Sequence, residues 1–246
     1  MDILQYFAGN YHGAPFVLFG PAHILTLFVV ALFILGLLRF KDAPESTLYK
    51  VRWTLAIVLW LNELAYHAWN LSIGMWTVQT MLPLQLCSVL VWAGGVMLVT
   101  KSRTIYEFAY LLGITGPLQT LLTPDAGPYG FPHFRYIQPV ISHGLLVAIA
   151  IYMTVVEGFR PTWKSLLRVF VVTNIYMFVI YFVNLSLGSN YLMVNFKPDV
   201  ESLLTLLPPW PWYILWMEAI GVAQMLLLYL PFAIRDRKKQ SIENRE

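Results

Sequence analysis

The chain contains a single cysteine, Cys87, which follows Leu82–Leu86 at the start of an apolar run. A cysteine in an apolar helix is usually an inert small hydrophobe, whereas a thiolate next to an imidazole is a nucleophile. The chemistry of Cys87 therefore depends on the polar residues that share its depth. A single cysteine also excludes an intramolecular disulfide framework.

Three ionisable residues are expected at the same depth. Cys87, His143 and Glu218 each follow the expected outer end of their apolar stretch, at positions 80, 136 and 211, by seven residues. At 1.5 Å per helical residue, each lies roughly 10 Å below the outer surface. A thiol and an imidazole that meet there predict nucleophilic acyl transfer, in which the imidazole holds the thiol proton.

Most of the other polar residues within the apolar stretches are also expected in the outer half of the membrane. Glu63, His67 and Asn70 recur at helical spacing and line one face of one helix. Ionisable groups in hydrocarbon are costly, so they normally face one another or a wet cavity. We expect an outer polar cavity supported by His23, Glu63, His67, Gln85, Arg135, Gln138, Asn184 and Glu218.

Two simpler interpretations of these residues stay open. His143 taken alone also fits a hydrogen-bonded core histidine. Glu63 and His67 fit an internal ion pair that holds two helices together. His12 and His133 lie in the outer segments and are interpreted as having no role in the functional site.

The elements that position these residues are membrane helices. The chain of 246 residues is 58% hydrophobic and only 12% charged, against about 25% charged residues in soluble domains. Stretches of about 20 apolar residues span a bilayer as helices. The sequence predicts an all-α, polytopic membrane bundle, a single domain over 1–246, with seven transmembrane helices near 21–39, 52–72, 80–99, 104–122, 136–157, 166–187 and 211–233.

Local sequence modifies two of these helices. Gly113, Gly116 and Pro117 predict a kink near the outer end of the fourth helix. Gly94 and Gly95 predict close packing of the third helix against a neighbour. The proline- and glycine-rich residues 123–132 are expected to form an outer lid.

The basic residues predict the orientation. Of the 16 lysines and arginines, 14 fall in segments on one side and only Arg135 and Lys197 fall on the other. The positive-inside rule therefore places the N-terminus outside and the C-terminus in the cytoplasm. Residues 1–20 become an external interfacial segment and 234–246 a cytoplasmic basic tail, which is a solvated tail rather than a nucleic-acid site.

Three motifs resemble a known family. They are Asn-Glu-x-x-x-His-x-Trp at 62–69, Leu-Pro-Leu-Gln-Leu-Cys at 82–87, and Phe-Arg-Tyr-Ile-Gln-Pro-Val-Ile-Ser-His-Gly at 134–144. Together they resemble the YwaF family of bacterial integral membrane proteins, related to the eukaryotic transmembrane protein 164 family of cysteine-dependent phospholipid acyltransferases. The resemblance covers essentially the whole chain.

The resemblance implies a function and a location. It implies a lipid acyltransferase of the bacterial cell membrane that acts on phospholipids and lysophospholipids without a cofactor or a metal. The family's cysteine falls on Cys87 and its histidine on His143. With water as the acceptor, the same site would be a lipid hydrolase.

Two other classes of function stay open. A metal-dependent lipid hydrolase would use imidazole and carboxylate ligands from His23, Glu63, His67 and His143, although no compact ligand motif is present. A transporter or receptor would also need an outward-facing polar cavity.

Overall fold

A computed structural model describes residues 3–197 and 206–243. Within these ranges the chain is helical and contains no strand, which confirms the all-α class. The elements are η1 (Ile3–Phe7), α1 (Pro21–Leu38), α2 (Glu45–Ser72), α3 (Leu86–Thr100), α4 (Arg103–Leu111), α5 (Thr115–Leu122), α6 (Phe134–Val155), α7 (Trp163–Leu187), η2 (Tyr191–Met193) and α8 (Trp212–Glu243).

The helices form two compact units. The first combines residues 1–76 with 87–159, and the second combines 77–86 with 160–246. Each unit is described by itself below. The single domain over 1–246 stays a prediction.

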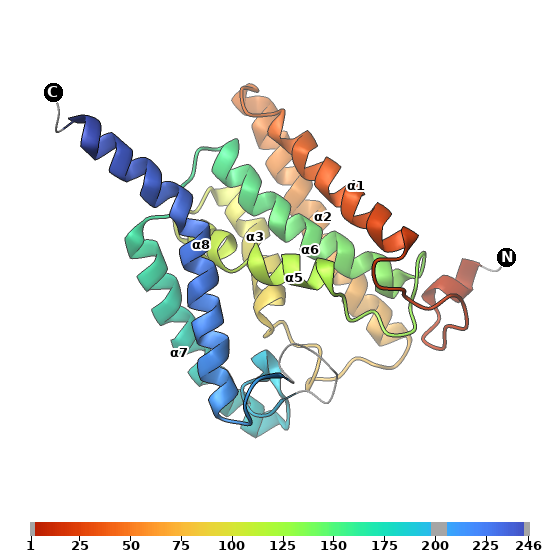
Figure 1. The fold of residues 1–246 in the computed structure, drawn as a ribbon. Helices are drawn as coiled ribbons and strands as arrows, with labels where there is room; N and C mark the ends of the chain where they lie inside the picture. Colours follow the sequence, from red (N-terminus) through yellow and green to blue (C-terminus); the bar gives the residue numbers. More distant parts are fainter. Residues whose placement is uncertain (1–2, 198–205, 244–246) are drawn as a thin grey trace. The chain divides into compact units, whose positions relative to one another are not determined.

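Helix α6 is the centre of the first unit. It packs against α1, α2, α4 and α5 (Figure 1), and its C-terminal half, from Gly144 to Ala150, is buried without interruption. Small residues allow close approach to this helix. A Cβ added to Gly94 of α3 would lie 2.7 Å from Cδ1 of Ile149. The expected close packing at Gly94 is therefore confirmed.

The fourth expected helix, 104–122, is two shorter helices, α4 and α5. The break falls between Leu111 and Thr115, just before the predicted kink residues Gly116 and Pro117. Pro117 takes a position in the first turn of α5, where its missing N–H needs no partner. A single helix with a kink was therefore the wrong expectation, because the glycines and the proline end one helix and start another.

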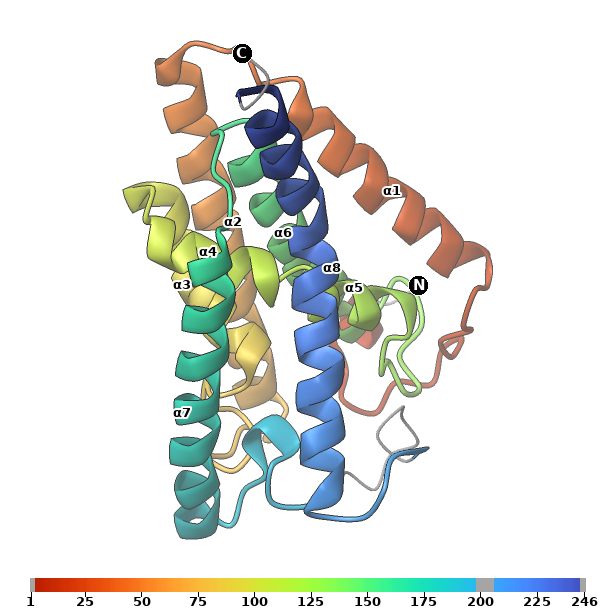
Figure 2. The ribbon, with the colours of Figure 1, turned by 60° about the vertical axis from the view of Figure 1, so that its left-hand side comes forward.

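In the second unit, α7 and α8 lie side by side (Figure 2). Helix α7 starts with a capping box, in which Thr162 and Ser165 satisfy each other's backbone N–H groups. It ends at Gly188, which adopts the left-handed conformation that glycine tolerates best.

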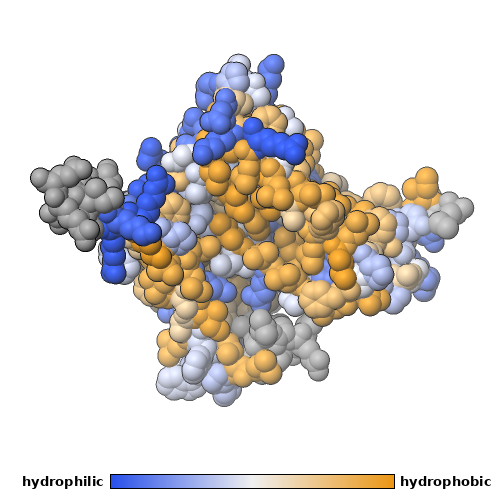
Figure 3. Space-filling view, turned by 45° about the horizontal axis from the view of Figure 1, so that its top comes forward, coloured by the Kyte–Doolittle hydropathy of each residue, from blue (hydrophilic) through white to orange (hydrophobic). Residues whose placement is uncertain are grey.

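The surface of the helices is suited to lipid. Four helices in the described part of the chain are long and apolar enough to cross a membrane: α1, α6, α7 and the Trp212–Lys238 portion of α8. Large apolar side chains on α1, such as Leu25 and Phe28, are exposed, and apolar side chains cover much of the face seen in Figure 3. The protein is a multi-pass membrane protein.

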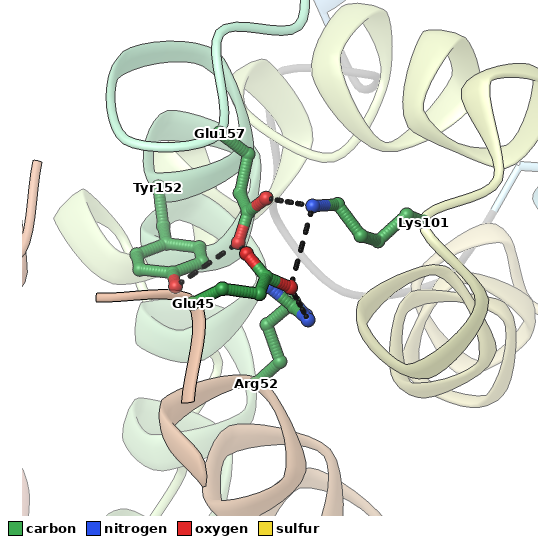
Figure 4. A network of polar contacts seen from close by, with 5 residues as sticks. All are labelled: Glu45, Arg52, Lys101, Tyr152 and Glu157. Atoms are coloured by element: carbon green, nitrogen blue, oxygen red, sulfur yellow. Dashed lines mark hydrogen bonds and ion pairs between the residues drawn. The ribbon is translucent and has the colours of Figure 1, made fainter. Parts of the chain in front are cut away.

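A buried ionic network holds the end of α6 to its neighbours (Figure 4). The Arg52 guanidinium of α2 contacts Glu157 at 2.5 Å and Glu45 at 2.7 Å, and Nζ of Lys101 contacts Glu157 at 2.7 Å. The hydroxyl of Tyr152 also donates to Glu157 at 3.4 Å. The hydrogen bond from Arg52 lowers the pKa of Glu45, which keeps this carboxylate ionised.

We expect Glu157→Ala to destabilise the protein by about 3 kcal/mol, because it leaves two cations sharing one exposed carboxylate. At about 2–4 °C per kcal/mol, the apparent Tm in detergent should fall by about 6–12 °C. The matched control is Asp42→Ala, which removes an exposed carboxylate. Equal Tm values for the two variants would contradict a stabilising role for the network.

Candidate functional site

A cavity of about 200 Å³ lies within the first unit. Cys87, the second residue of α3, lines it together with His143 of α6 and Glu63 of α2. The thiol, the imidazole and the carboxylate, which are far apart in the sequence, therefore line one cavity. Cys87 as a residue is partly exposed, and it lines the cavity.

Helix α6 presents one polar face to this cavity. Arg135, Gln138, Ser142 and His143 all line it, and their spacing of three, four and one residues keeps them on adjacent positions of a helix. Sequence reasoning missed Ser142. Its spacing of four residues from Gln138 was the signal that could have identified it.

The local structure of α6 sets the tautomer of His143. Its Nδ1 lies 2.8 Å from the carbonyl oxygen of Pro139, one turn earlier. A carbonyl only accepts, so Nδ1 carries the proton and Nε2 keeps its lone pair. His143 is therefore prepared to accept a proton at Nε2.

Glu63 and His67 form a second polar pair on α2. The Trp76 indole donates to Nδ1 of His67 at 3.0 Å, so Nε2 of His67 carries a proton. That nitrogen lies 3.8 Å from Oε1 of Glu63. Glu63 is 5% exposed and lines the cavity, whereas His67 is not among the lining residues.

His23 is in the cavity wall, but both of its nitrogens are occupied. Nδ1 accepts from the backbone N–H of Phe19 at 3.0 Å, and Nε2 donates to the carbonyl of Leu121 at 2.8 Å. The ring therefore holds the start of α1 to the end of α5. It has no nitrogen left to act as a base or a ligand in this arrangement.

The loop at 123–132 forms part of the cavity wall through Pro124, Asp125 and Ala126. The N-terminal segment packs on this loop, because the Tyr129 hydroxyl donates to the carbonyl of Gly9 at 2.7 Å. The loop predicted as a lid thus borders the cavity, and the N-terminal segment is attached to it.

His133 joins the same two segments and was wrongly interpreted as incidental. It is fully buried, accepts from the backbone N–H of Arg135 at 3.0 Å and contacts the carbonyl of Ala8 at 3.1 Å. Burial lowers the pKa of His133, which favours its neutral form. Its position as the N-cap of α6 explains why one residue contacts both segments.

Three of the expected cavity residues belong to the second unit and are described with it. The Gln85 side chain accepts from the backbone N–H of Leu192 at 3.0 Å. The buried Asn184 amide donates to the carbonyl of Tyr191 at 2.9 Å and accepts from its N–H at 2.8 Å. Glu218 lies on α8. Gln85 and Asn184 therefore hold the segment after α7.

The four residues considered as metal ligands do not form a ligand set. Within residues 3–197 and 206–243, no group of three or more histidine, cysteine, aspartate or glutamate side chains is arranged to hold a metal ion. His23 in particular is committed to two backbone groups.

The sequence model of the TMEM164 family matches residues 18–229, which include every residue named in the cavity. No curated protein matches the chain. No solved structure matches it either.

Proposed function

The chain belongs to the TMEM164 family, and from this premise we propose that it is a membrane-embedded lipid acyltransferase that works through an acyl-thioester on Cys87. The observation that carries the proposal is the shared cavity of Cys87 and His143, with Nδ1 of His143 held by Pro139. A nucleophile and an oriented base that line one cavity are the groups that covalent acyl transfer requires.

In the first half-reaction, Nε2 of His143 takes the proton of the Cys87 thiol as sulfur bonds to the ester carbonyl carbon. The ester C–O bond then breaks, and the proton passes from His143 to the leaving lysolipid oxygen. In the second half-reaction, His143 takes the proton of an acceptor hydroxyl as its oxygen bonds to the thioester carbonyl carbon, the C–S bond breaks, and His143 returns the proton to the Cys87 sulfur. The acyl chain has then moved from one lipid to another.

The Pro139 carbonyl fills the place that a carboxylate holds in a Ser-His-Asp triad, since it fixes the tautomer and orientation of the imidazole. Glu63 is left for a different role. Its carboxylate in the same cavity would stabilise the positive charge on His143 while that ring holds the proton.

Arg135 supports phospholipids and lysophospholipids as the substrates. Its guanidinium lines the cavity, and no carboxylate among the described residues forms an ion pair with it. An arginine binds phosphate through two parallel hydrogen bonds. A lipid phosphate at Arg135 would place its ester further along the polar face of α6, toward His143.

The proposed topology has seven membrane crossings, with the N-terminus outside and the C-terminus in the cytoplasm of the cell. The 14 to 2 division of the basic residues supports this orientation. Helices α4 and α5 together form the fourth crossing. Their junction is compatible with a membrane because Gly113 and Ile114 are buried in protein, where an interrupted helix is tolerated.

We expect cysteines introduced at Gly127 and Gln240, in a Cys87→Ser background, to label from opposite sides. An impermeant thiol reagent applied to intact cells should modify position 127, and position 240 only after permeabilisation. The physical reason is the cost of moving the basic tail across the bilayer. Labelling of both positions from one side would exclude the seven-crossing topology.

The activity itself is tested by intact-protein mass spectrometry. The purified full-length protein, incubated with phospholipid vesicles, should gain the mass of one acyl chain at Cys87. Addition of lysophospholipid should remove this mass and yield the acylated product. A wild-type protein that forms no adduct and transfers no acyl chain would contradict the proposal.

A further inference from the structure

The Gln138 side-chain amide is buried in the cavity wall and has no hydrogen-bond partner among the described residues. Gln138 is 4% exposed, and apart from the backbone hydrogen bonds of α6 its only hydrogen bond to a described residue is the one that its backbone carbonyl accepts from Asn62 at 3.2 Å. Every fully enclosed side-chain nitrogen or oxygen in the described part has a partner. The Gln138 amide must therefore be in contact with the cavity space that it lines.

Ser142 repeats this pattern one turn further along α6. It is 6% exposed, lines the cavity, and its hydroxyl has no partner within the described ranges. Because every fully enclosed side-chain nitrogen or oxygen in the described part has a partner, this hydroxyl must also be in contact with the cavity space. Two such donors on one helix face, next to His143, indicate a ligand atom that accepts hydrogen bonds when the cavity is occupied.

The other cavity side chains are less suited to this role. The Tyr136 hydroxyl donates to Thr26 at 2.9 Å, the Thr120 hydroxyl donates to the carbonyl of Gly116 at 3.2 Å, and His23 is fully hydrogen-bonded. Arg135, Tyr66 and Ser88, which also line the cavity, are only partly buried. Gln138 thus combines N–H donors with nine-tenths burial and an unused amide.

We propose that the Gln138 amide, assisted by the Ser142 hydroxyl, forms the oxyanion hole of the acyl transfer. This inference rests on the proposed function. When the Cys87 sulfur bonds to the carbonyl carbon, the π electron pair moves onto the carbonyl oxygen, and the Gln138 N–H groups donate to that oxyanion. The pair returns as the C–O bond to the leaving alkoxide breaks, and His143 gives its proton to that alkoxide.

The test compares two reactions of the same thiol in full-length protein. Formation of the acyl-enzyme passes through an oxyanion, whereas alkylation of Cys87 by iodoacetamide does not. We expect Gln138→Met, which keeps the size and removes the donors, to slow acyl-enzyme formation by about 10²–10³-fold. Alkylation should stay within about threefold of wild type. Ser142→Ala should give a smaller loss of the same kind.

The matched control is Gln119→Met, at an exposed position of α5 outside the cavity wall, which should leave both rates unchanged. Wild-type acylation by Gln138→Met would overturn the oxyanion role while the proposed function stands. A parallel loss of alkylation and acylation would also overturn it, because Gln138 would then only maintain the cavity. A wild-type protein without any acyl-enzyme would instead reject the proposed function.

Discussion

Replacement of Cys87 with alanine is expected to abolish acyl transfer while the protein still folds. The sulfur is the atom that would carry the acyl chain, and no second cysteine exists to replace it. The side chain is partly exposed to an existing cavity, so its loss should cost only about 1 kcal/mol of stability. Transfer of labelled acyl chains between lipids in vesicles measures the loss.

Cys87→Ser is the control for the shape of the site. It keeps the volume and polarity of the side chain, but a hydroxyl is a much weaker nucleophile than a thiol at neutral pH. Both variants should therefore be inactive with a near-normal Tm. An alanine variant with wild-type turnover would exclude the thioester mechanism outright.

Conversion of His143 to glutamine is expected to lower the turnover rate by about 10²- to 10⁴-fold. Glutamine keeps much of the polarity in the cavity but cannot take the thiol proton. Lipid binding should change far less, since the variant removes proton transfer rather than surface contact. The comparison of kcat with the lipid Kd, measured on the same preparation, separates these two effects.

His12→Gln provides the matched control, because His12 is an exposed histidine outside the cavity wall. It should leave turnover unchanged. If His143→Gln also kept wild-type turnover, the base would have to be another group. His23 would not qualify, because both of its nitrogens are bonded to the backbone.

The constant rise of 1.5 Å per helical residue predicted a depth for each polar residue from the sequence. Cys87 and His143 do line one cavity, but the count behind this prediction was wrong for Cys87, because α3 begins at Leu86 and residues 80–85 are not helical. The same rule also placed Asn184 in the outer half. Depth alone does not state which way a side chain faces, and Asn184 instead bonds to Tyr191 within its own unit.

Local sequence signals mark the ends of α1 and α7, although the predicted bounds of α2 and α3, near 52–72 and 80–99, missed the observed starts at Glu45 and Leu86. Pro21 starts α1, the Thr162–Ser165 capping box starts α7, and Gly188 ends it. These signals act within one turn of the chain, so they do not depend on the rest of the fold. The glycines and the proline of the fourth apolar stretch likewise indicated a kink there, but not that the stretch is divided into two helices, α4 and α5.

By itself, then, the sequence determined the helical class, the membrane environment and the residue types available for acyl chemistry, all of which follow from local spacing and composition. Only the tertiary structure decided the partners. It brought Arg52 and Glu157, 105 residues apart, into one buried ion pair, and it joined His133 to the N-terminal segment. It also left the side-chain amide of Gln138, in the cavity wall, without a partner among the described residues. The rotation of each helix about its axis decides such contacts, and that rotation is set by packing against neighbours rather than by any single stretch of sequence.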